Sequence, residues 1–174
     1  MDREKVIKAL GEDVSREGLK DTPRRVADAY AELLSGTDKT AEEELSRTFA
    51  ADGGGVVIEK DIWFSSACEH HLMPFFGKMH IAYIPQGRVA GLSKLARTVE
   101  IFSKRLQLQK RLTSQVAEEN LRCLKPEGVF VICEAEHTCM TCRGIKKAGS
   151  KTVTYCAKGN FSQELRGEVL AAIK

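Results

Sequence analysis

The sequence predicts a single α+β domain, an antiparallel sheet with helices packed on one face. The chain has 174 residues, of which 43% are hydrophobic and 29% charged, a composition typical of one globular domain. Hydrophobic residues recur at helical spacing in some segments and alternate with polar ones in others. The predicted elements run in the order helices, two strands, two helices, two strands and a helix. That order favours antiparallel pairs over alternating parallel units.

The first third of the chain is predicted to be helical and to end in a loop. Thr22 and Pro23 suit the N-cap and the first position of a helix, because threonine can cap a free amide and proline lacks one. Hydrophobic residues follow at helical spacing until a glycine ends the run. Residues 37–55 are polar, end in three glycines and are expected to form a surface loop. We therefore expect an N-terminal helical segment with its loop over residues 1–55.

The remainder, residues 56–174, is expected to form the main domain. β-Branched and aromatic residues that alternate with polar ones predict strands, and leucine and valine at helical spacing predict helices. The strands are expected at residues 56–64, 75–83, 129–135 and 151–157, and the helices at residues 91–102, 108–121 and 161–173.

Composition excludes several classes of partner. The formal net charge of +3 is too small to indicate a nucleic-acid-binding protein. No apolar run approaches the roughly 20 residues that a membrane-spanning helix needs. The first residues, Met1–Lys5, lack the pattern of a signal peptide. We expect a cytoplasmic protein with neither nucleic acid nor membrane as a partner.

Cysteine and histidine are concentrated in one part of the chain. All six cysteines and four histidines lie between Cys68 and Cys156. In a reducing compartment such clusters indicate a metal site or catalysis more often than disulfides. Cys68 and His71 are close enough in sequence to share one metal ion, and Cys139 can supply a third ligand from a neighbouring strand. Thiolate and imidazole ligands favour Zn²⁺ over Mg²⁺ or Ca²⁺.

Two interpretations of this cluster remain open. A structural zinc would have four protein ligands, with Cys142 closing the shell. A catalytic zinc would have three protein ligands and one water. Glu69, His70 and His137 flank the ligands, and such acid–base groups are needed by a hydrolytic site but not by a structural one.

A basic segment follows the second predicted strand. Lys94 and Arg97 are three residues apart, on one helix face. Ser93 stands at the helix start, where free backbone amides attract anions. Arg143 belongs to a second basic group that follows the cysteines. A phosphate-bearing ligand beside a zinc site would explain both groups, and the alternative is a solvated basic face.

The ordered motifs resemble the GTP cyclohydrolase I family from about Val6 to the C-terminus. The resemblance implies a T-fold, and subunits assembled into a toroidal decamer with active sites between subunits. It also implies a reaction that opens the imidazole ring of GTP, releases formate and forms 7,8-dihydroneopterin triphosphate. The matching motifs are Asp21-Thr22-Pro23, Cys68-Glu69-His70-His71, Gly91-Leu92-Ser93-Lys94-Leu95-Ala96-Arg97, Arg105-Leu106-Gln107, His137-Thr138-Cys139-Met140-Thr141-Cys142-Arg143-Gly144 and Ser150-Lys151-Thr152-Val153-Thr154.

The same resemblance implies a role for each candidate residue. Zinc ligands would be Cys68, His71 and Cys139, with water in the fourth position. Proton transfer would involve His70 and His137, with Glu69 as a further catalytic candidate. Substrate binding would involve Ser93, Lys94, Arg97 and Arg143 on the triphosphate, Arg25 from a neighbouring subunit, and Gln109 on the purine base.

The residue after Gln109 is the main departure from the family pattern. Relatives usually carry glutamate directly after the glutamine that contacts the base, and here that residue is Lys110. An ammonium group only donates hydrogen bonds, so it cannot accept from the ring N–H and amine of guanine. Either the backbone reads the base, or the substrate is another purine-type nucleotide, or the chain is a weakened or non-catalytic zinc-binding paralogue. Relatives also usually lack a cysteine at position 142.

Overall fold

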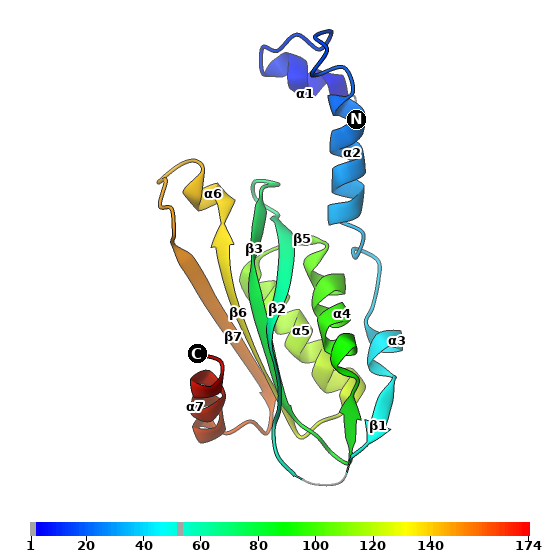
Figure 1. The fold of residues 1–174 in the computed structure, drawn as a ribbon, viewed down its shortest axis with the longest axis vertical. Helices are drawn as coiled ribbons and strands as arrows, with labels where there is room; N and C mark the ends of the chain where they lie inside the picture. The colour runs from blue at the N-terminus through cyan, green and yellow to red at the C-terminus, as the bar shows by residue number, and fades with distance from the viewer. Residues whose placement is uncertain (1–2, 52–53) are drawn as a thin grey trace.

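The computed structural model describes residues 3–51 and 54–174 and shows a mixed α+β fold (Figure 1). Its central sheet has five strands in the order β5-β2-β3-β6-β7. Neighbouring strands are antiparallel, except that the short β5 runs parallel to β2. The strands are β2 (Val57–Cys68), β3 (Pro74–Ile84), β5 (Leu106–Gln107), β6 (Gly128–His137) and β7 (Lys151–Gly159).

One face of the sheet forms the main core with two long helices. These helices are α4 (Leu92–Ser103) and α5 (Gln109–Leu124). Leu95, Val99 and Leu112 are completely buried against the sheet. Burying a side chain of this size stabilises the fold by about 1.5–3 kcal/mol. The helical spacing of these residues predicted both helices and the face that each one buries.

The last helix departs from the prediction that all helices cover one face. Helix α7 (Gln163–Ala172) packs on the opposite face of the sheet. There Phe161 and Val169 join a second core with Phe130 and Ile132. The reason lies in β6, which is apolar on both faces because consecutive residues point to opposite sides of a strand. A strand of this kind needs cover on both sides.

Residues 37–55 are not simply a surface loop, so that expectation is wrong. They contain helix α3 (Glu42–Leu45) and strand β1 (Thr48–Ala50), and β1 pairs with β4 (Arg88–Ala90). Ala41 and Leu45 are completely buried in the main core. Two apolar residues among many polar ones were enough to anchor the segment. Residues 52–53 of the expected loop lie outside the described residues.

The N-terminal helices project beyond the end of the sheet (Figure 1). They are α1 (Arg3–Ala9) and α2 (Thr22–Leu33). Asp21, rather than Thr22, occupies the N-cap position of α2, and no side chain caps the helix. The Thr22 hydroxyl donates instead to the backbone oxygen of Gly18. Within the described residues, no helix has the length and apolar character needed to cross a membrane.

Candidate metal centre and catalytic site

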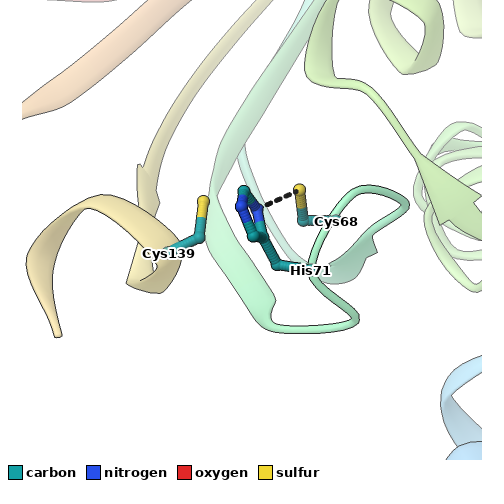
Figure 2. Close-up of side chains that lie close together, drawn as sticks. All are labelled: Cys68, His71 and Cys139. Atoms are coloured by element: carbon teal, nitrogen blue, oxygen red, sulfur yellow. Dashed lines mark hydrogen bonds between the residues drawn. The ribbon is translucent and has the colours of Figure 1, made fainter. Parts of the chain in front are cut away.

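Three side chains converge at one end of the sheet and form a candidate metal site (Figure 2). Cys68 ends β2, His71 lies in the turn that follows, and Cys139 lies in the short helix α6 (Thr138–Thr141). Their ligand atoms all lie within 4.8 Å of one another. The Sγ atom of Cys68 is 3.8 Å from Nδ1 of His71.

Backbone hydrogen bonds hold the turn that presents Cys68 and His71. The Cys68 N–H donates to the Met73 oxygen at 2.8 Å, and the Cys68 oxygen accepts from the N–H of Leu72 at 2.8 Å. Leu72 has a φ of 56°, the left-handed conformation that reverses the chain so tightly. Cys68 and His71 are therefore positioned by a turn of defined shape.

The third ligand comes to this turn through strand pairing. Phe75 of β3 is paired with His137, the last residue of β6, so α6 begins beside the turn. The Thr138 hydroxyl donates to the Pro74 oxygen at 2.6 Å and ties α6 to the start of β3. Cys139 follows Thr138 directly, which places its thiol opposite Cys68 and His71.

The chemistry of the three donors fits a transition metal. Burial and then the nearby Cys68 sulfur raise the pKa of the Cys139 thiol. Two sulfurs so close together disfavour two thiolates unless a cation neutralises them. Two thiolates and one imidazole form a donor set that zinc accepts well. Cys142 is exposed at the end of α6 and is not a member of the group found among the described residues.

His137 is held in a defined orientation beside this group. Its ring stacks on Phe75, with centroids 4.6 Å apart and planes 10° from parallel. Its Nε2 lies 2.8 Å from Oε1 of Gln109. The Gln109 Nε2 donates to the backbone oxygens of Cys133 at 3.0 Å and Thr152 at 2.9 Å. Burial lowers the pKa of His137, which favours the neutral ring at pH 7.

Glu69 is paired with an arginine that the sequence did not single out. Its Oε2 contacts a guanidinium nitrogen of Arg111, and the same guanidinium also donates to Gln107 at 3.0 Å. The hydrogen bond from Arg111 is the main reason why the pKa of Glu69 is lowered. Glu69 is therefore ionised near neutral pH. The two residues are 42 positions apart in sequence, so no local pattern indicates the pair.

Three further candidates lie on the surface near the metal group or Gln109. His70 is exposed, and its ring is nearly perpendicular to that of His71 with centroids 6.1 Å apart. Arg143 is exposed beyond α6, and its charge acts to lower the pKa of Cys139. Lys110 is exposed in the first turn of α5, directly after the buried Gln109.

The remaining candidates are separated from the metal group in a single chain. Helix α4 has 12 residues and is about 18 Å long. Its far end leads into β5, which pairs with Ala67 and Cys68, so Ser93 and Lys94 lie toward the opposite end of the sheet. Arg25 is exposed on α2, which projects from the sheet (Figure 1). One chain therefore brings Arg143 to the metal group but leaves Ser93 and Lys94 away from it.

The fold is similar to that of a solved archaeosine synthase. A crystal structure of archaeosine synthase QueF-Like in the apo form covers 63% of this chain and 98% of its own, with a TM-score of 0.51 and 18% sequence identity. At that identity the likeness concerns the fold alone. Fold and site together define an α+β protein of the T-fold type with a Cys–His–Cys group suited to a metal.

Sequence comparison identifies the family. The sequence profile of GTP cyclohydrolase I matches residues 2–174. The chain is 55% identical over 171 residues to GTP cyclohydrolase 1 of Clostridium kluyveri, covering 97% of this chain and 92% of that protein. It is 54% identical over 159 residues to the Streptococcus pneumoniae enzyme of the same name, covering 91% and 86%. The chain belongs to the GTP cyclohydrolase I family and is an enzyme of that type.

Proposed function

We propose that this enzyme is a zinc-dependent GTP cyclohydrolase I that opens the imidazole ring of GTP, releases formate and forms 7,8-dihydroneopterin triphosphate. The observation that carries the proposal is the three-donor group of Cys68, His71 and Cys139 beside the oriented His137. Family membership supports GTP as the substrate. The six free cysteines suit a reducing compartment, the cytoplasm.

The metal would be held by Cys68, His71 and Cys139. Zinc bound by three protein ligands supplies a water of lowered pKa, which is the chemistry that hydrolysis of a purine ring at neutral pH needs. A donor group of three, with Cys142 outside it, supports this open site over the closed structural one.

Proton transfer is assigned to the two histidines near the metal group. Because the amide nitrogen of Gln109 donates to two carbonyls, its oxygen faces His137 and accepts from the Nε2–H. The neutral ring then offers Nδ1 as the proton acceptor. His70 is exposed to solvent and can exchange protons with it. For Glu69, the ion pair with Arg111 favours a role as a fixed negative charge.

We further propose that the complete site forms between copies of the chain. Arg143 is near the metal group, whereas Ser93 and Lys94, at the start of α4, lie toward the opposite end of the sheet. A neighbouring copy that presents the start of α4 would complete a site for the triphosphate. The outer edge of β7, with Val153 and Tyr155 exposed, supports assembly of such copies. The toroidal decamer of the family is the assembly that we propose.

A second candidate substrate is favoured by Lys110. Its ammonium group replaces the carboxylate that relatives use on guanine, and its exposure beside Gln109 leaves it free to meet a base. A purine-type nucleotide with a hydrogen-bond acceptor on that edge would suit it better than guanine.

The deciding experiment is an assay of the zinc-loaded protein with GTP for formate and for pterin fluorescence after oxidation. Formate together with pterin would establish the proposed reaction. Formate without pterin would mean that the ring opens but the sugar rearrangement fails. If neither product forms while zinc is bound and the protein is folded, the same assay on other purine nucleotides separates the second candidate from a non-catalytic protein.

A further inference from the structure

Glu44 lies between two cations that we assign to the triphosphate. Its Oε2 accepts a hydrogen bond from the Lys94 ammonium at 2.6 Å, and its Oε1 is 3.7 Å from a guanidinium nitrogen of Arg97. The side chains of Lys94 and Glu44 are only 15% and 26% exposed. One carboxylate thus spans both cations, with one oxygen facing each, as two oxygens of a phosphate group would.

The fold fixes Glu44 in this place. Its neighbour Leu45 is completely buried in the main core, which anchors α3. The N–H of Ala41 donates to the Glu119 carboxylate at 3.2 Å and holds the start of α3 against α5. Ion pairs between two exposed, flexible side chains contribute little free energy, because both side chains must be ordered to form them. The Glu44 carboxylate is instead positioned by its buried neighbour Leu45.

We infer that Glu44 is a built-in competitor of the substrate, and that a phosphate group displaces its carboxylate when it binds Lys94 and Arg97. The inference rests on the proposed function, because it takes these two residues as phosphate-binding. A carboxylate and a phosphate cannot both sit on Lys94 without like-charge repulsion. Glu44 therefore holds the two cations in place when no substrate is bound. The same carboxylate weakens phosphate binding, because it must be displaced first.

The surroundings give the displaced carboxylate a place to go. A cavity of about 260 Å³ opens beside Glu44 and Arg97. Lys39 and Lys104 also line this cavity, together with Glu100, which is paired with Lys104 at 3.1 Å. A carboxylate that rotates away from Lys94 thus remains near Lys39, Arg97 and solvent, which keeps the free-energy cost of its displacement small.

The test is calorimetric titration of the full-length protein with inorganic tripolyphosphate. Glu44→Gln keeps the shape of the side chain and an oxygen that accepts from Lys94, but removes the charge. We expect it to lower the dissociation constant roughly three- to tenfold, the effect of one partly exposed ion pair. Glu43→Gln is the matched control, since it makes the same charge change in the same helix at an exposed residue outside the ion pairs with Lys94 and Arg97. It should shift the constant less than about twofold.

Unchanged or weaker binding by Glu44→Gln would overturn the inference and make Glu44 a residue that merely positions Lys94. If that variant does not fold, Glu44→Asp withdraws the carboxylate by one methylene and should also bind tripolyphosphate more tightly, by a smaller factor. Failure of the wild-type protein to bind either tripolyphosphate or GTP would overturn the proposed function together with this inference. Binding by the wild type with no gain in the variants would overturn only the role of Glu44.

Discussion

The side chain of Gln109 fixes the proton of His137 on Nε2. Both N–H groups of the Gln109 amide are used by backbone oxygens of β6 and β7, so its oxygen is left to accept from the imidazole at 2.8 Å. A half-buried histidine whose tautomer is set in this way offers Nδ1 for proton transfer. The sequence resemblance assigns Gln109 to the purine base, whereas the contacts within the chain assign it to His137.

Replacing Gln109 by methionine should reduce kcat about ten- to a hundredfold, because an unheld His137 transfers protons less effectively. It should also lower the free energy of unfolding by about 1–3 kcal/mol, because the buried Cys133 oxygen and the partly buried Thr152 oxygen each lose a donor. Steady-state kinetics and urea unfolding measure both effects. Gln163→Met, the same change at an exposed position at the start of α7, is the control. A rise in KM with kcat unchanged would show instead that Gln109 binds the purine base.

Removing any one of Cys68, His71 and Cys139 should release the metal, whereas removing Cys142 should not. Serine in place of either cysteine deletes a thiolate from the three-donor group, and alanine in place of His71 deletes the imidazole. Metal content by mass spectrometry, measured on the four purified variants after dialysis, tests this directly. Loss of zinc from Cys142→Ser would instead support the closed, structural site.

Replacing Lys110 by glutamate should favour guanine. The carboxylate can accept from the ring N–H and the amine of guanine, and such a charge-assisted contact is worth about 1.5–3 kcal/mol, or roughly ten- to a hundredfold in affinity. The measurement is kcat/KM for a panel of purine triphosphates in both proteins. An unchanged preference would show that Lys110 does not face the base.

Two variants that are each inactive should regain activity when they are mixed in one oligomer, if the site lies between copies of the chain. Cys139→Ser removes a metal ligand and Lys94→Met removes a phosphate-binding ammonium. When the two variants are co-expressed, random assembly should leave roughly a quarter of the sites with both intact halves. GTP turnover by the mixture, compared with each variant alone, is the readout. No recovery in mixed oligomers would place all site residues in one chain.

The free energy of unfolding should fall as the pH drops below the ordinary histidine pKa of 6.5, in part because of His80. Its Nδ1 accepts from the Asp61 N–H at 3.1 Å, and burial lowers its pKa, a shift that Asp61 partly opposes. Below pH 6.5 the unfolded chain therefore takes up a proton more readily than the folded one, until the pH passes below the folded pKa. His80→Gln should lose less stability between pH 7.5 and pH 5.5 in urea titrations. An equal loss of unfolding free energy in both proteins would show that His80 does not contribute to the pH dependence.

The sequence predicted the strands and the long helices well because their hydrophobic patterns are strong. It missed α3 because the acidic run at residues 42–44 hides the buried Ala41 and Leu45. It missed the face that α7 covers because periodicity in one helix does not say which side of a sheet it meets.

For the candidate site, the sequence predicted the metal-binding residues but not the contacts that hold the neighbouring side chains. Short motifs supplied the three metal-binding candidates, and strand pairing brings them together. The pair of Glu69 and Arg111 and the stack of Phe75 on His137 join distant parts of the chain, so only the fold reveals them. The sequence also cannot tell whether Lys94 meets Cys139 of its own chain or of a neighbour, because both copies carry the same residues.

The hydroxyl of Tyr30, on α2, donates to the Leu72 backbone oxygen at 2.7 Å, one residue after His71. The projecting N-terminal helices are thereby fastened to the turn that carries two of the three metal-binding candidates. A bulky tag or a truncation placed before α2 can shift this helix. Through the hydrogen bond of Tyr30 such a shift would move the turn that carries His71. Preparations that differ only at the N-terminus should therefore be compared for metal content before their activities are compared.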